Sequence, residues 1–203
     1  MYIVHKNYLK ALVICHGGSE KDICDVIKAE LKLNIRIISR DNGGTSIQIT
    51  SLYDELEKHK LDNYDDFIKE YGNLIDYENN KIINNFKIFI IMDTDDCTPE
   101  QKSEFINKNM FKDKNLRKYI VPIYNDKKLE DVFYKVKLID IRKKTSKEIK
   151  REYKKLMTKW MQNEAKQKEF YEKLLKVKNI SNMHEFIKFC LDNRPIHKKT
   201  NNK

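Results

Sequence analysis

Ile88-Phe89-Ile90-Ile91-Met92 is followed directly by Asp93-Thr94-Asp95-Asp96 in this 203-residue chain. A continuous apolar run without alternation is typical of a strand that is buried on both faces of a parallel sheet. Three similar runs occur at Leu12–Cys15, Ile35–Ile38 and Tyr119–Tyr124. Helical patterns lie between them, as the crossover connections of parallel strands require. We therefore predict an α/β fold with an open, mainly parallel four-stranded sheet flanked by helices.

The connections carry helix signals. Ser19 can cap a helix that continues to Leu31, and a second helix is expected from Thr45 or Ser46 to about His59. A short helical piece is expected at 67–71, and Pro99 is suited to the first turn of another helix. The resulting order of strands and helices is that of a doubly wound sheet.

The C-terminal third differs from the rest. Thr145-Ser146-Lys147-Glu148 has the form of a capping box, and the apolar positions that follow have helical period. We predict one long amphipathic helix to about Lys176 and a shorter one over 183–191. Such a helix projecting alone would expose an apolar stripe, which makes a homodimer plausible. The expected organisation is a domain over 1–140 with an α-helical extension over 141–203.

The charge is uneven along the chain. The net charge is +10, but residues 141–203 hold 19 Lys/Arg against 7 Asp/Glu, whereas residues 1–140 are nearly neutral. A basic segment suits phosphate contacts with DNA or RNA. We take Lys147, Lys150, Arg151 and Lys154 as the candidate nucleic-acid contacts. The alternative is an ordinary solvated helix face.

Composition excludes several classes of protein. No apolar run approaches the roughly 18 residues of a membrane span, so no membrane partner is expected. The N-terminus has no signal-peptide pattern, and the four cysteines form no C-x-x-C pair, so we expect reduced thiols and a cytoplasmic location. The chain also lacks the G-x-x-x-x-G-K-[ST] motif of an ATPase.

Chemistry is expected where the predicted strands end. The first strand is followed by His16-Gly17-Gly18-Ser19-Glu20, and the central strand by Asp93 and Asp95. In an open parallel sheet these loops lie at the same edge, where ligands bind. Carboxylates there can bind a hard cation such as Mg²⁺. The alternatives are a dipole-compensating role for Glu20 and helix capping by the two aspartates.

A second loop joins the second strand to the next helix. Asp41-Asn42-Gly43-Gly44-Thr45-Ser46 combines two glycines with hydroxyls at an expected helix start. Free backbone N–H groups at such a position suit an anion. We therefore take Gly43, Gly44, Thr45 and Ser46, together with Gly17 and Gly18, as candidate phosphate-binding residues. The alternative is an ordinary turn and helix cap.

The two motifs, in this order and spacing, resemble those of TOPRIM domains. Val13–Glu20 is similar to the first TOPRIM motif, and Ile88–Asp95 to the second, over about residues 8–135. The OLD-like, anti-phage branch is the most similar, and Glu20 matches the second acid of its first motif. Glu130 resembles an acidic residue that follows the fourth strand in some of these nucleases.

The resemblance implies metal-dependent cleavage of DNA or RNA. Glu20, Asp93, Asp95 and Glu130 would hold Mg²⁺ or Mn²⁺, and His16 stands where the family has its first glutamate. A histidine can move a proton or bind a transition metal, but it is a poorer ligand for Mg²⁺. The resemblance also implies a role in bacterial anti-phage defence with a separate ATPase as partner.

Two other functions remain open at this point. His16 is compatible with a catalytically inactive TOPRIM-like module that binds nucleic acid or a protein partner. The Asp93-x-Asp95 pattern is also compatible with a phosphoacceptor domain. Against the latter, Cys97 stands where a dehalogenase-like motif needs Thr or Val, and that motif belongs on the first strand.

Overall fold

The computed structural model describes residues 7–79, 81–140 and 144–195. The strands are β1 (Ala11–Cys15), β2 (Ile35–Ile38), β3 (Tyr77–Glu78), β4 (Lys81–Ile82), β5 (Lys87–Asp93) and β6 (Ile120–Asn125). The α-helices are α1 (Gly18–Glu30), α2 (Leu52–Lys58), α3 (Tyr64–Tyr71), α4 (Pro99–Ile106), α5 (Lys114–Arg117), α6 (Leu129–Lys135), α7 (Ser146–Met161), α8 (Glu164–Leu175) and α9 (Met183–Asp192). Two 3₁₀ turns cover Arg40–Gly43 and Ile49–Ser51.

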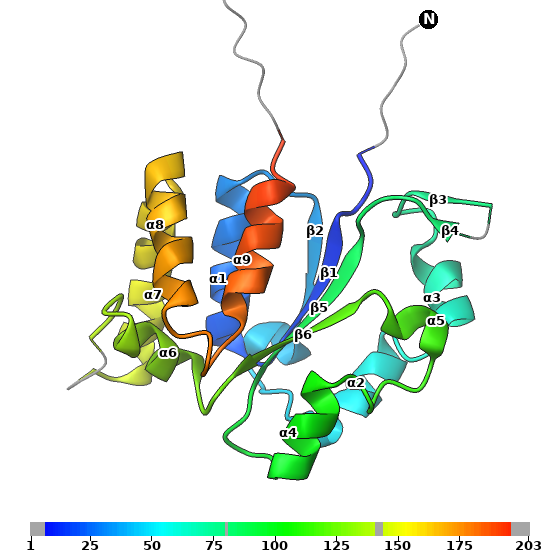
Figure 1. Ribbon diagram of the computed structural model, residues 1–203, viewed down its shortest axis with the longest axis horizontal. Coiled ribbons are helices and arrows are strands. Elements are labelled where there is room, and N and C mark those ends of the chain that lie inside the picture. Colours follow the sequence, from blue (N-terminus) through cyan, green and yellow to red (C-terminus); the bar gives the residue numbers. More distant parts are fainter. Residues whose placement is uncertain (1–6, 80, 141–143, 196–203) are drawn as a thin grey trace, which may run out of the picture.

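The main sheet has four parallel strands in the order β2-β1-β5-β6. Helices cover both faces (Figure 1), with α1 and α6–α9 on one side and α2–α5 on the other. The predicted α/β class and parallel four-stranded sheet are confirmed. The separate β3–β4 hairpin and the helices α5 and α6 were not predicted, because each is short and carries little periodic pattern.

Two hydrophobic cores follow from the alternation of side chains along each strand. On β1, Val13 and Cys15 face the core beneath α1 and the C-terminal helices, whereas Leu12 and Ile14 face the core beneath α2–α5. All four side chains are at most 1% exposed. The strand is therefore buried on both faces, as its continuous apolar sequence predicts.

The predicted long C-terminal helix is wrong, because the chain breaks between α7 and α8. Asn163 caps α8 by accepting a hydrogen bond from the Lys166 amide at 3.0 Å. The Gln167 side chain donates at 2.8 Å to the Met161 carbonyl at the end of α7. Both helix ends at the break thus have side-chain partners that a continuous helix would not need. The capping box at Thr145 is confirmed.

The C-terminal helices do not project from the domain. Four residues of the predicted apolar stripe are buried in the same core as β1 and β5: Tyr153, Met157, Met161 and Leu174. Ile149, Leu156, Trp160 and Tyr171 are partly buried and pack against that core. The reason for expecting a homodimer is therefore wrong, and the dimer itself stays a prediction.

Two predicted helix starts also need correction. The helix expected from Thr45 or Ser46 begins only at Leu52, because the Ile47 amide donates to the His16 carbonyl at 2.7 Å and ties this segment to the end of β1. The first helix is capped by Gly17 rather than Ser19. Within the described ranges, no helix is both long enough and apolar enough to cross a lipid bilayer.

Candidate active site

The predicted loops meet at the carboxyl edge of the sheet. β1 and β5 are neighbours, with Cys15 opposite Ile91, so the segments that follow them leave the sheet side by side. They enclose a cavity of about 350 Å³. Its lining comprises His16, Gly17, Gly18, Ser19, Glu20, Ser46, Gln48, Asp93, Asp95, Asp96, Lys128 and Glu130. The structure thus brings together all the predicted acidic residues and His16.

Glu20 and Glu130 are held by the first turn of α1. The Gly17 amide donates to Glu20 Oε2 at 3.0 Å, and Glu20 is only 2% exposed. The Ser19 hydroxyl donates to Glu130 Oε1 at 3.0 Å and so joins α1 to α6. Glu20 thus accepts a hydrogen bond at the start of α1, and the residue also lines the cavity.

Asp93 is a cavity acid whose pKa is strongly raised. Its Oδ1 accepts hydrogen bonds from Asn125 Nδ2 at 3.0 Å and from the Leu129 amide at 3.2 Å, and the residue is 5% exposed. Burial, and then the nearby carboxylates of Glu20, Glu130 and Asp95, raise the pKa of Asp93 to about 9; the Asn125 hydrogen bond acts in the opposite direction. The cavity thus disfavours a further negative charge.

Lys128 is a cavity residue that the sequence analysis missed. Its Nζ lies 3.4 Å from Asp95 Oδ2, and its side chain is 59% exposed. The neighbouring Asp95 carboxylate raises the pKa of Lys128, so the ammonium is charged at neutral pH. A lysine in the segment that follows the fourth predicted strand is too common a pattern to be singled out from sequence.

Tyr153 reaches the acidic cluster from α7. It is fully buried, and the Glu130 carboxylate lies beside its hydroxyl. Burial, and then the carboxylates of Glu130, Glu20 and Asp93, raise the pKa of Tyr153. The sequence showed Tyr153 only as part of an apolar stripe, so its place beside these acids could not be predicted.

His16 presents an unpartnered ring nitrogen. Its backbone is fixed on both sides, since the amide donates to the Ile91 carbonyl and the carbonyl accepts from Ile47. In the described part of the chain, Nδ1 is buried and has no hydrogen-bond partner. The ring is part of the cavity lining, so the site includes a side chain of the type that can accept or donate a proton.

The predicted phosphate loop is only partly at the cavity. Ser46 lines it, as do Gly17 and Gly18, whereas Gly43, Gly44 and Thr45 are not in the lining. Thr45 Oγ1 instead donates to Asp41 Oδ2 at 2.6 Å within the loop.

Gly43 packs closely against the start of α1, next to the cavity. Its φ is +85°, and a Cβ there would lie 2.9 Å from the Gly18 Cα at the start of α1. Gly43→Ala is expected to destabilise the protein by about 1–3 kcal/mol, because it adds strain and a backbone clash. Urea unfolding measures this change. Gly44→Ala is the control: at φ −73° it adds no positive-φ strain, although its Cβ would lie 3.0 Å from the Asp41 carbonyl oxygen, so it should cost less. Equal losses would contradict the strain argument at Gly43.

The predicted nucleic-acid contacts lie on α7. Lys147 and Arg151 are exposed, whereas Lys154 Nζ pairs with Asp22 Oδ1 of α1 at 3.1 Å. The side chain of Lys150 lies outside the described residues. Lys154 is thus engaged in holding α7 against α1, and Lys147 and Arg151 stay candidates.

A divalent cation is compatible with the donors of the cavity. Among the described residues, no three histidine, cysteine, aspartate or glutamate side chains are already arranged around a point that could hold a metal ion. The donors are nevertheless carboxylate oxygens, which Mg²⁺ prefers. Burial is the main cause of the raised pKa of Asp93, and repulsion from the neighbouring carboxylates, which a cation would relieve, adds to it.

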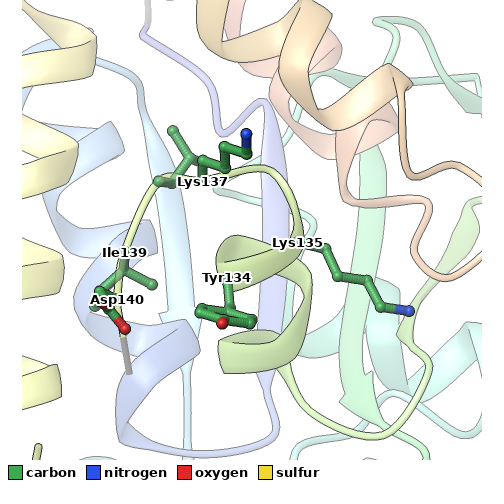
Figure 2. Close-up of a pocket in the computed structure, with 6 residues that line it drawn as sticks. Tyr134, Lys135, Lys137, Ile139 and Asp140 are labelled. Atoms are coloured by element: carbon green, nitrogen blue, oxygen red, sulfur yellow. The ribbon is translucent and has the colours of Figure 1, made fainter. Parts of the chain in front are cut away.

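A larger cavity, of about 480 Å³, lies elsewhere. It is formed by the end of α6 and the segment after it, where Tyr134, Lys135, Lys137, Ile139 and Asp140 surround it (Figure 2). Asp140 is its one carboxylate, so the lining offers no counterpart to the acidic cluster at the sheet edge. The size of a cavity does not decide where chemistry occurs; the convergence of polar groups does.

Comparison of the chain with protein-family models, with curated proteins and with solved structures gives no match.

Proposed function

We propose that this protein is a metal-dependent nuclease that hydrolyses phosphodiester bonds of DNA or RNA. One observation carries the proposal: Glu20, Asp93, Asp95 and Glu130 line a single cavity at the carboxyl edge of a parallel sheet, together with His16 and Lys128. Ligand sites of open α/β sheets occur at this edge. Assignment to TOPRIM-like enzymes, a role in anti-phage defence and a separate ATPase partner belong to the proposal and rest on the motif resemblance.

The four acids would hold Mg²⁺ or Mn²⁺. When bound, such a cation polarises phosphoryl oxygens and makes water a better nucleophile. His16 would accept or return a proton, because its ring lines the cavity. The Lys128 ammonium would contact a non-bridging phosphate oxygen. Ser46 and the start of α1 would position the same phosphate, since both line the cavity.

A nuclease assay tests this proposal directly. Purified protein is incubated with plasmid, linear duplex, single-stranded DNA and structured RNA, each with Mg²⁺, Mn²⁺ or EDTA. Cleavage should require the metal and should fall by at least about 10³-fold in an Asp93→Ala/Asp95→Ala variant, because the loss of metal ligands removes most of the charge stabilisation. The matched control is Asp65→Ala/Asp66→Ala on α3, which removes two aspartates that lie outside the cavity lining.

A second function remains a candidate because His16 stands where the TOPRIM family has its first glutamate. In this alternative the cavity of an inactive module binds nucleic acid or a protein partner. Calorimetric titration with Mn²⁺ separates the two: binding that Asp93→Ala/Asp95→Ala abolishes supports the nuclease, and no binding by the unmodified protein supports the module.

A further inference from the structure

The segment before α9 is joined to the candidate site by a buried chain of hydrogen bonds. Asn125 is the last residue of β6 and the register partner of Asp93 on β5. Its Nδ2 donates to Asp93 Oδ1 at 3.0 Å, and its Oδ1 accepts from the Ser181 hydroxyl at 2.8 Å. The exposed fractions of Asp93, Asn125 and Ser181 are 5%, 0% and 1%. Water therefore does not compete for these bonds.

The donor and acceptor roles along this series of hydrogen bonds are set by the Met183 backbone N–H, which can only donate. The Met183 backbone N–H, in the first turn of α9, donates to Ser181 Oγ at 3.1 Å. The Ser181 hydroxyl proton is then free to point at Asn125, whose amide oxygen must face Ser181 and whose NH₂ must face Asp93. A flipped Asn125 amide would place an oxygen against the carboxylate and leave the Ser181 proton without an acceptor.

The result is an asymmetric Asp93 carboxylate. Oδ1 receives two donors, Asn125 Nδ2 and the Leu129 amide, which fix the plane of the group. Among the described residues, the hydrogen bonds to the Asp93 side chain all go to Oδ1 and none goes to Oδ2. Asp93 is part of the cavity lining. The fixed oxygen thus faces the protein and the second is the one available to a ligand.

We propose that Asn125 and Ser181 are positioning residues that orient Asp93 in the candidate site. This inference rests on the proposed function, because it assigns the oriented carboxylate to metal binding. Partners that orient a metal-binding carboxylate typically affect affinity 10–100-fold when they are removed.

The test measures Mn²⁺ affinity by calorimetry in the full-length protein, with the melting temperature of each variant recorded beside it. Ser181→Ala is expected to weaken Mn²⁺ binding by roughly 10-fold, because Asn125 loses the partner that fixes its amide. Ser181→Cys, which has a weak donor of similar size, should give an intermediate loss. Ser181→Thr keeps the hydroxyl and should bind within about 2-fold of the unmodified protein.

The matched control is Asn182→Ala. Asn182 anchors the same segment, since its side chain accepts from the Tyr124 amide at 2.8 Å and donates to the Pro122 carbonyl at 2.9 Å. It has no hydrogen bond with Asp93 or Asn125 among those described. Asn182→Ala should therefore lower the melting temperature at least as much as Ser181→Ala while leaving Mn²⁺ affinity nearly unchanged.

The outcomes separate the two proposals. If the unmodified protein binds Mn²⁺ and Ser181→Ala binds it equally well, or if Asn182→Ala loses as much affinity as Ser181→Ala, the positioning role is overturned while the metal site stands. If the unmodified protein binds no Mn²⁺, the proposed function fails and the positioning role falls with it. A selective loss in Ser181→Ala, restored in Ser181→Thr, supports the inference.

Discussion

Asp93→Asn is expected to unfold at a higher temperature than the unmodified protein when metal is absent, and to lose the proposed cleavage activity. The pKa of Asp93 is raised to about 9 in the folded protein, against about 4 for an unfolded aspartate. Between these values the folded state retains a proton that the unfolded state releases, so the unfolding free energy falls as pH rises from about 4 to 9. Asparagine has no such cost and can still accept both hydrogen bonds at Oδ1.

We expect a gain of about 1–3 kcal/mol at pH 8, which corresponds to roughly 3–10 °C for a chain of this length. Calorimetric scans in EDTA at pH 5 and pH 8 measure it, and the gain should be smaller at pH 5 because less of the penalty has accumulated there. Lower stability of the variant at pH 8 would contradict the repulsion described for the cavity. A stabilised but inactive variant is what a strained functional site should give.

Phe186→Ala should destabilise the protein strongly and in a single transition. Phe186 is fully buried on α9, and its ring packs edge-on against Phe89 of β5 at 5.1 Å between centroids. Removal of a buried phenylalanine ring costs about 3–5 kcal/mol, because apolar contacts are lost and a cavity remains. The melting temperature should fall by roughly 10 °C or more.

The number of transitions in the same experiment tests the organisation of the chain. If residues 141–203 folded as a separate unit, Phe186→Ala would shift only part of the signal. A shared core predicts that α9 and β5 unfold together. Tyr134→Ala is the control, because that ring is 38% exposed on α6 and its loss should change stability by less than about 1 kcal/mol.

The sheet and its chemistry-bearing edge were predictable because two strong signals agree. Continuous apolar runs identified the four parallel strands, and the polar residues directly after Cys15 and Met92 marked the ends of two neighbouring strands. The order of strands then required His16, Glu20, Asp93 and Asp95 to lie near one another. Periodicity and topology were sufficient for this part of the fold and of the site.

The rest depended on tertiary contacts that no local pattern carries. The break at Asn163 is compatible with a continuous helical period, and it is recognisable only once Gln167 is seen to satisfy the Met161 carbonyl. The spacing of Tyr153 is that of a core residue, and the residue does lie in the core. The spacing therefore gives no sign that Tyr153 also lies beside the acids of the cavity. Asn125 and Ser181 are 56 positions apart, and nothing in the sequence indicates that they meet.

The segment at 180–182 has a consequence for association between molecules. β6 is an outer strand of the sheet, and Ser181 forms an antiparallel bridge with Asn125 beside it. The Ile180 carbonyl accepts a hydrogen bond from the Asp126 amide at 2.6 Å. The Asn182 side chain accepts a hydrogen bond from the Tyr124 amide and donates one to the Pro122 carbonyl. Backbone groups that would otherwise serve as a template for a foreign strand are thus occupied. Extension of the sheet by another chain is blocked along this part of β6. The outer strand at the opposite side of the sheet is β2.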